Sequence, residues 1–259
     1  MVLEKSETDF KILRRRLKQN VGAADADKYR FYGQHFPQLD EFLFKRYFPD
    51  VNVQGVFVEC GANNGQAGSN CKFFEETMHW TGYNLEASPH TFQSLQNNRP
   101  NSINLNCALS DHCGEIAFAL TEPICENPAY LGAVDRVISK NNLLHAGAIF
   151  TVSGADYRVY DTVTVPSLTW KQFIEENNIS FVDLFVLDTE GHEVEVIDGM
   201  AGSPVLPSII CVEDGWRPEV RSKLHELGYV FDITHFGNHM YVLQGLLGLF
   251  ALRAVHKNY

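Results

Sequence analysis

The sequence has few cations for its length. Its 259 residues include 21 Lys and Arg against 32 Asp and Glu, which gives a formal net charge of -11. Binding to duplex nucleic acid is therefore disfavoured, because phosphate contacts need clustered Lys and Arg. The basic run of residues 14–16 is explained more simply as the exposed face of a helix than as a polyanion or membrane contact. We expect no nucleic-acid partner.

Paired cysteines are also missing. The six cysteines include no CxxC pair, so a structural zinc site is disfavoured. Cys60, Cys107 and Cys211 lie in apolar, strand-like runs, where cysteine behaves as a small core residue. This usage predicts reduced thiols and a cytoplasmic location.

No run of apolar residues is long enough to cross a membrane. The segment from Met240 to Leu252 contains Gln244 and two glycines, and it is shorter than the roughly 20 residues that a spanning helix needs. It is predicted to be a last strand followed by a packing helix. The opening residues carry charge from Glu4 onward and do not resemble a signal peptide. We therefore expect a soluble protein with no transmembrane segment.

The chain alternates between strand-like and helix-like segments after an N-terminal helical segment, residues 1–50, that packs on the core. Residues 51–259 form one α/β domain, and 45% hydrophobic residues suffice for its core. Apolar strands that alternate with helices predict a mostly parallel sheet covered on both faces, with an antiparallel hairpin at one edge. Residues 121–160 fit no clean period and are interpreted as an irregular lid or substrate insertion.

The loop after the first predicted strand lacks the residues of the common phosphate-binding loops. In "VFVECGANNGQAGSN", Asn63 replaces the second glycine of GxGxxG, and no Lys-Ser/Thr pair follows as in a P-loop. A loop without a cation suits a ligand with a zwitterionic amino-acid end. Glu59 could accept a bond from its ammonium group, and Asn63 with the loop amides could bind its carboxylate.

Two later strand ends suggest an adenosine ligand. Glu86 follows the second strand, where an acid bonds a ribose hydroxyl in dinucleotide folds; a surface carboxylate is the alternative. Ala108, Leu109 and Ser110 end the third strand and could flank an adenine.

Acids gather at the ends of the next two strands. Asp188, Glu190 and His192 follow one of them, with Glu193 beside them, and Glu213 and Asp214 end the other. Three converging carboxylates (Asp188, Glu213, Asp214) would suit Mg²⁺. The alternatives are that they bond ligand and backbone donors, and that Asp188 is a helix N-cap.

His192 is the first candidate for a general base, because an imidazole titrates near neutral pH. A helix-capping role is the alternative for this residue. His235 and His239, in the final hairpin, are second candidates, although histidines in turns are more often structural.

Taken together, these segments resemble the FkbM family of S-adenosylmethionine-dependent methyltransferases over residues 30–245. The matching stretches are "GVFVECGANNGQAGSN", "NLEASPHTFQSLQNNRP", "NCALSDHCG", "TVPSLTW", "LFVLDTEGHEVEVIDGM" and "CVED". The resemblance implies a class I methyltransferase (Rossmann-like) fold, with a seven-stranded sheet in which one strand is antiparallel. It also implies O-methylation, often of a sugar or glycan hydroxyl such as that of a rhamnose- or fucose-like unit.

The resemblance assigns roles to residues that match the family's motifs. The residues expected to bind S-adenosylmethionine are Glu59, Gly61, Ala62, Asn63, Gly65, Ser69, Asn70, Glu86, Ala87, Ala108, Leu109, Ser110 and Asp188. Asp188, Glu190 and His192 are expected to face the transferring methyl group. Asn64 departs from relatives that carry an acid there. The three carboxylates also resemble those of metal-dependent sugar O-methyltransferases, which implies Mg²⁺ or Mn²⁺ on Asp188, Glu213 and Asp214.

Other functions stay open at this point. They are methylation of a natural-product hydroxyl that is not a sugar, an NAD-dependent oxidoreductase on a related fold, and an interaction module without catalysis. The family also suggests a fused or associated glycosyltransferase as a partner. Aromatic residues in the irregular stretch could stack on sugar rings, namely Tyr130, His145, Phe150, Tyr157 and Tyr160.

Overall fold

A seven-stranded sheet forms the centre of the protein. The computed structural model describes residues 28–66, 68–124, 135–138, 145–152, 155–214 and 217–246. The strand order is β11-β12-β10-β9-β1-β2-β3. The strands are β1 (Val56–Cys60), β2 (Thr81–Leu85), β3 (Ile103–Leu105), β9 (Leu184–Leu187), β10 (Ile209–Glu213), β11 (Tyr229–His235) and β12 (Asn238–Leu243). Only β12 runs antiparallel to its neighbours, which confirms the predicted sheet and its edge hairpin.

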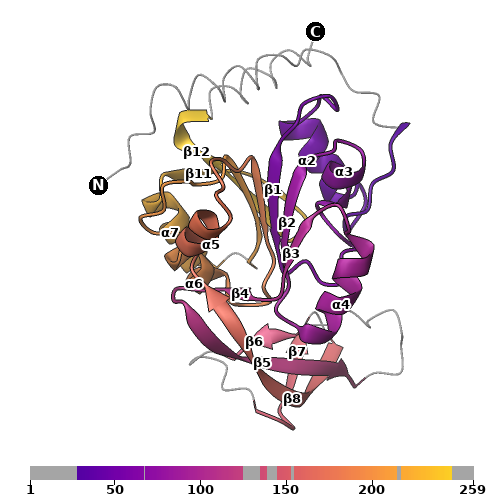
Figure 1. Ribbon diagram of the computed structural model, residues 1–259, viewed down its shortest axis with the longest axis vertical. Helices are drawn as coiled ribbons and strands as arrows, with labels where there is room; N and C mark the ends of the chain where they lie inside the picture. The colour runs from indigo at the N-terminus through magenta and orange to yellow at the C-terminus, as the bar shows by residue number, and fades with distance from the viewer. Residues whose placement is uncertain are drawn as a thin grey trace.

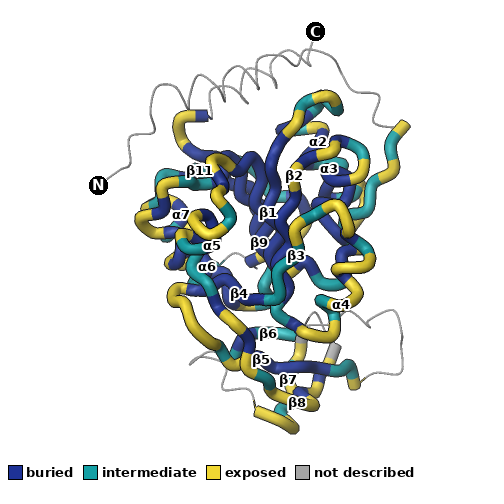
Figure 2. Tube along the Cα trace, in the orientation of Figure 1, coloured by how far each residue is buried: buried dark blue, intermediate teal, exposed yellow. Residues whose placement is uncertain are grey.

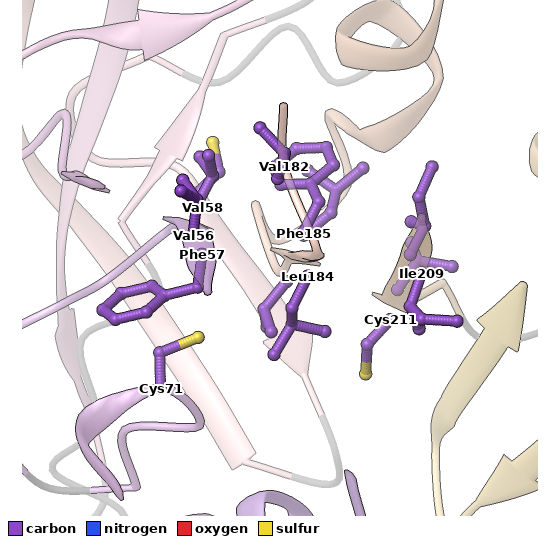
Figure 3. Packing of buried hydrophobic residues seen from close by; sticks show 14 of the residues in the cluster. Val56, Phe57, Val58, Cys71, Val182, Leu184, Phe185, Ile209 and Cys211 are labelled. Carbon is purple, nitrogen blue, oxygen red and sulfur yellow. The ribbon is translucent and has the colours of Figure 1, made fainter. Parts of the chain in front are cut away.

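Helices cover both faces of this sheet. They are α2 (Leu39–Tyr47), α3 (Lys72–Glu76) and α4 (Pro89–Asn98) on one side, and α5 (Trp170–Glu176), α6 (Glu193–Asp198) and α7 (Pro218–Glu226) on the other (Figure 1). Every residue of β1 is therefore buried, as Figure 2 shows for the middle of the sheet. Phe57, Leu184 and Ile209 come from three strands and belong to one packed core (Figure 3). Burial of each such side chain stabilises the fold by about 1.5–3 kcal/mol.

A second sheet lies across the carboxyl ends of the first, at the bottom of Figure 1. Its order is β4-β8-β5-β6, with β7 paired to β8. The strands are β4 (Ala108–Leu109), β5 (Gly114–Pro123), β6 (Arg136–Val137), β7 (Ile149–Val152) and β8 (Ala155–Leu168). Residues 121–160 were predicted to be irregular. This prediction is wrong where the structure describes these residues, because much of the stretch is strand.

The alternation of β8 explains this difference. Tyr157 and Val159 are buried, whereas Arg158 and Tyr160 point outward, which is the period of a half-buried strand. Opposite Leu120 and Thr121 of β5, β8 has an extra residue, Tyr160, without a register partner, and this shift interrupts the pattern. The third predicted strand, which was expected to end at Ala108, Leu109 and Ser110, also divides, because β3 belongs to the first sheet and β4 to the second.

The two ends of the chain confirm part of what was predicted. Helix α2 confirms helical structure within residues 1–50, whereas residues 1–27, with the basic run, lie outside the described residues. Strand β12 continues into a short 3₁₀ turn, Gln244–Leu246, and the predicted packing helix beyond it also lies outside them. Within the described ranges, no helix has the length and apolar character to cross a membrane. Five cysteines there are free thiols; Cys125 is not among the described residues.

Candidate active site

A cavity of about 550 Å³ opens where the first sheet meets the second. This volume is within the range of about 300–1,000 Å³ typical of small-molecule sites. The predicted residues that line it are Glu59, Gly61, Ala62, Asn63, Ser69, Asn70, Glu86, Ala87, Ala108, Leu109, Asp188, Glu190 and His192. Four predicted residues are not in the lining, namely Gly65, Ser110, Glu213 and Asp214. The sequence therefore located the cavity from residues at the ends of four strands, β1, β2, β4 and β9.

A glycine turn closes the cofactor loop against a neighbouring strand. Gly61 has a φ of 82°, and a Cβ atom there would lie 1.7 Å from the carbonyl oxygen of Asp188. The backbone N–H groups of Gly61 and Ala62 both donate to the carbonyl oxygen of Leu85. Only glycine permits this approach, so the ends of β1, β2 and β9 are held together by backbone.

Glu59 is held by three internal donors. Its carboxylate accepts bonds from the backbone N–H of Asn70 (2.9 Å), the Ser69 hydroxyl (3.1 Å) and the Arg99 guanidinium (3.0 Å). Arg99 is fully buried and also pairs with Glu75. Sequence analysis gave no role to Arg99, which lies just after α4 and near the end of the matching stretch "NLEASPHTFQSLQNNRP". The ammonium-binding role of Glu59 stays a prediction, and the structure adds that this residue fixes the loop.

Glu86 offers two carboxylate oxygens to the cavity. The backbone N–H of Asn63 donates to Oε2 (2.7 Å), and that of Ser88 donates to Oε1 (2.8 Å). An ionised carboxylate has about four acceptor sites, and the Thr91 side chain also bonds to this one, so part of the accepting capacity of Glu86 stays available. Burial raises the pKa of Glu86 to about 7, and the charge of Asp135 acts in the same direction.

The second sheet supplies an apolar wall. Ala108 and Leu109 of β4 line the cavity beside Phe118, Val137 and Tyr157, which come from β5, β6 and β8. These three were not predicted from the loop motifs, although Tyr157 was named as an aromatic that could stack on a sugar. An aromatic and aliphatic wall of this kind suits a flat ring such as adenine.

Ser110 does not have the adenine-flanking place that was predicted for it. Its hydroxyl lies 3.0 Å from Nε2 of His192 and 3.1 Å from Oδ1 of Asp111. His192 is at the N-cap position of α6, but its side chain makes no capping bond. The side chain therefore belongs to the cavity wall rather than to the helix end.

Acidic groups surround Asp188. Its carboxyl hydrogen-bonds to Glu213, and burial, together with the charges of Glu213 and Glu190, raises the pKa of Asp188 well above its ordinary value. Glu190 has a φ of 54°, and Arg136 of the second sheet donates to its carboxylate (3.2 Å). The N-cap alternative for Asp188 is wrong, because His192 holds that position.

Glu193, one of the acids after β9, has a structural role. It accepts bonds from the N–H groups of Thr189 and Gly191 and pairs with Arg217. Glu193 thereby fixes the turn between β9 and α6, which aims the neighbouring residues at the cavity.

The predicted three-carboxylate metal site is not formed. Asp214 turns away to His239, whose Nδ1 lies 2.5 Å from Oδ1 of Asp214 in a fully buried pair. Within the described ranges, no group of three or more His, Cys, Asp or Glu side chains is arranged to hold a metal ion. The Mg²⁺ or Mn²⁺ prediction therefore does not fit the donor set of Asp188, Glu213 and Asp214.

The other proposed side chains lie mostly away from the cavity. His235 bonds to the carbonyl oxygen of Pro37, and neither it nor His239 lines the cavity. Phe150 stacks on Tyr157 with ring centroids 5.9 Å apart, whereas His145 and Tyr160 are exposed. Tyr130 lies outside the described residues.

Comparisons with known proteins found a matching family model and several similar solved structures. The family model of the methyltransferase FkbM domain matches residues 59–231. Among solved structures, methyltransferase FkbM from Methylobacillus flagellatus KT is 11% identical with a TM-score of 0.43; the match covers 91% of this chain and 58% of that one. Methanococcus jannaschii fibrillarin pre-rRNA processing protein is 13% identical with a TM-score of 0.38, over 75% and 69% of the two chains.

A third similar structure is Aeropyrum pernix fibrillarin in complex with natively bound S-adenosyl-L-methionine. It is 10% identical with a TM-score of 0.35, over 73% of this chain and 65% of that one. No curated protein sequence matches the chain. The family model covers well over half of the 259 residues, and it includes the glycine turn, Glu86 and the acids after β9. The chain therefore belongs to the FkbM methyltransferase family.

Proposed function

We propose that the protein is an S-adenosylmethionine-dependent O-methyltransferase that methylates a hydroxyl of a sugar or glycan, such as a rhamnose- or fucose-like unit. The observation that carries this proposal is the arrangement of the cavity. Glu86 follows β2, whereas Asp188, Glu190 and His192 follow β9, and these two strands flank β1 on opposite sides. The residues between them come from the glycine turn and the apolar wall of the second sheet.

The cavity residues fit the parts of this cofactor. The accepting capacity that stays available on Glu86 suits a ribose hydroxyl. Ala108, Leu109 and Phe118 provide the apolar contact for adenine. Asn63 and Glu59 lie at the methionine end, where the loop amides and a carboxylate complement a zwitterion.

A sugar acceptor is supported by the charge of the lining. The described side chains around the cavity include the carboxylates of Glu59, Glu86, Asp135, Asp188 and Glu190, and no Lys or Arg. Such a surface repels anionic acceptors and accepts hydrogen bonds from neutral hydroxyl groups. A sugar ring is a neutral acceptor with several such hydroxyls.

The residues of the chain have three tasks in this reaction. S-adenosylmethionine, when bound, supplies an electrophilic methyl group. Asp188 and Glu190 orient the acceptor hydroxyl by hydrogen bonds, because alignment of the two reactants lowers the barrier. His192 takes the hydroxyl proton, because an uncharged imidazole is a base near neutral pH. The apolar wall excludes water, which would compete for the same hydrogen bonds.

We derive no step through a metal ion, because Asp214 is engaged by His239 and does not join Asp188 and Glu213. We also propose that the acceptor comes from a glycosyltransferase, either fused or associated, and that the reaction takes place in the cytoplasm. The free thiols at Cys60, Cys107 and Cys211 support the cytoplasmic assignment, because disulfides are rare there.

The test has two arms. Calorimetric titration with S-adenosylhomocysteine should show binding, whereas NAD under the same conditions should show none. Methyl transfer from labelled S-adenosylmethionine should then be measured on rhamnosides, fucosides and a non-sugar polyol, with and without a chelator. We expect label on a sugar at an unchanged rate in the chelator. Binding of NAD alone, or label on the non-sugar polyol alone, would contradict the proposal.

A further inference from the structure

Gln34 lines the cavity although no motif of the sequence includes it. It lies in the segment before α2, upstream of residues 59–231 that the family model matches. Its side chain lies over the cofactor loop, because a Cβ atom on Gly68, which lines the same cavity, would be 2.9 Å from Cγ and 3.6 Å from Nε2 of Gln34. The Gln34 amide has no hydrogen-bond partner among the described residues, so its two N–H bonds can donate to a ligand.

Buried hydrogen bonds fix the backbone that carries Gln34. The carboxylate of Asp40 is fully buried, and it accepts from the backbone N–H groups of Tyr32 (2.7 Å) and Gly33 (3.0 Å). Gly33 pairs with Gly68 in a parallel β-bridge. The carbonyl oxygen of Gln34 accepts from the first backbone N–H of α2 (3.1 Å). Because the backbone is already ordered, a ligand has to order only the Gln34 side chain, which lowers the entropy cost of binding.

The neighbours of Gln34 indicate which part of the cofactor lies beside it. The backbone N–H of Gln34 points to Oδ1 of Asn70 (3.4 Å), and the backbone N–H of Asn70 donates to Glu59 (2.9 Å). Glu59 is the residue expected to accept from the ammonium group of the methionine part. The carboxylate of an α-amino acid is attached to the same carbon atom as its ammonium group. A donor close to Glu59 is therefore in the right place for this carboxylate.

Neutral donors have to bind a carboxylate at this place. The described lining contains no Lys or Arg, and the fully buried Arg99 pairs with Glu59 and Glu75 instead. The Ser69 hydroxyl has one proton, which it donates to Glu59 (3.1 Å). The side-chain amide of Gln34 has no such partner among the described residues, and a bond from an amide to a carboxylate is charge-assisted and strong.

We infer that Gln34 is a cofactor-binding residue whose side-chain amide donates to the carboxylate of the methionine part of S-adenosylmethionine. The inference rests on the proposed function for the identity of the cofactor. It extends the cofactor site to a residue that precedes β1 and lies outside the matched family domain. Glu59 accepts from the ammonium group and Gln34 donates to the carboxylate, so the site selects ligands that carry both groups.

Two ligands that differ only in the carboxylate test the inference by calorimetry. They are S-adenosylhomocysteine and 5′-deoxy-5′-(3-aminopropylthio)adenosine, which has a hydrogen atom in place of the carboxylate. Gln34→Ala should weaken binding of S-adenosylhomocysteine about 5- to 20-fold, because a hydrogen bond to a charged group is lost, and should leave binding of the second ligand unchanged. Gln34→Glu should weaken binding of S-adenosylhomocysteine about 20- to 100-fold, because two carboxylates then face each other, and should not weaken binding of the second ligand.

Gln38→Ala is the matched control. Gln38 is the same residue type in the same segment, but its side chain makes no capping bond to α2 and does not line the cavity. Its replacement should change neither affinity. Gln34 is exposed, so its variants should fold, and equal melting temperatures without ligand check this. In steady-state kinetics, Gln34→Ala should raise KM for S-adenosylmethionine more than it lowers kcat.

Two results would overturn the inference alone: wild-type affinity for S-adenosylhomocysteine in both Gln34 variants, or an equal loss of affinity for the two ligands, which would indicate a structural role. If the wild type does not bind S-adenosylhomocysteine, the proposed function and the inference are both wrong. If the expected affinities are found but no sugar is methylated, Gln34 stands as a cofactor-binding residue and the proposed acceptor is wrong. Failure of the two proposals is therefore distinguishable.

Discussion

The two ends of the cavity are built differently. At the cofactor end, groups are fixed by backbone bonds and buried ion pairs, as in the two N–H bonds to Glu86 and the Arg99 pairs with Glu59 and Glu75. At the acceptor end, Glu190 is held by Arg136, and both of these side chains are partly exposed. Arg136 belongs to β6 of the second sheet, whereas Glu190 follows β9 of the first.

The difference corresponds to two tasks: binding of the cofactor, which is constant, and binding of the acceptor, which can vary. A cofactor that is the same in every turnover is best served by a rigid, preorganised site. An acceptor contacted through half-exposed side chains can change by single substitutions without loss of the fold. We therefore expect large effects from substitutions at the cofactor end and smaller effects at the acceptor end.

Replacement of Arg99 should cause the largest loss. Arg99→Met leaves the carboxylates of Glu59 and Glu75 buried without their cation, so the free energy of unfolding should fall by about 3–5 kcal/mol. Urea denaturation followed by circular dichroism measures this change. Arg158→Met is the control, since its pair with Glu122 is exposed and should contribute less than about 1 kcal/mol. Equal losses in the two variants would mean that the buried network has no special role.

Alanine at Gly61 should be the next most damaging change. The new methyl group would collide with the carbonyl oxygen of Asp188 at a positive φ, which we expect to cost about 2–4 kcal/mol and to weaken S-adenosylhomocysteine binding. Gly202→Ala is a matched control, because Gly202 also has a positive φ (70°) but the methyl group added there would meet no atom within 4 Å. If both variants bind the ligand as the wild type does, the close approach at Gly61 is not needed for the site.

The two ends of the cavity also differ in how many of their residues could be predicted from the sequence. The cofactor end follows from local patterns, because a strand, a turn of glycines and a terminal acid are adjacent in the chain. Glu59, Gly61 and Glu86 were located in this way. Arg99 was not, because its ion pairs join residues 24 and 40 positions apart, and no local pattern marks a buried arginine.

The acceptor end depends on contacts that periodicity does not encode. The second sheet pairs β5 with β8 across a register shift, which hid the alternation of Tyr157 and Val159. The metal prediction was wrong for a related reason. Asp188, Glu213 and Asp214 do end neighbouring strands, but successive residues of a strand point to opposite faces. Asp214 therefore meets His239 of β12 while Glu213 meets Asp188.

The titration of Glu86 should give a smaller but more specific effect. Its pKa of about 7 means that roughly a tenth of the protein carries the ionised carboxylate at pH 6 and about nine-tenths at pH 8. Ribose hydroxyls donate to the ionised form, so affinity for S-adenosylhomocysteine should rise up to about tenfold from pH 6 to pH 8. By the same linkage, the ligand lowers the pKa of Glu86. Calorimetry at several pH values measures this rise, and Glu86→Gln should bind more weakly with no such rise; an unchanged slope in that variant would assign it to another group.

The smallest effect on catalysis is expected from a substitution in the partly exposed ion pair of Arg136 and Glu190. Arg136→Gln removes the cation that donates to Glu190 and that lies 4.6 Å from the Phe150 ring centroid. Exposed ion pairs contribute about 0.2–1 kcal/mol, so kcat/KM for the acceptor should fall only about two- to fivefold. The affinity for S-adenosylhomocysteine should not change, because Glu190 is not among the residues that fix the cofactor loop. A parallel loss of cofactor affinity in Arg136→Gln would show that the two ends of the cavity are coupled, and the division between a rigid cofactor end and an adjustable acceptor end would then be wrong.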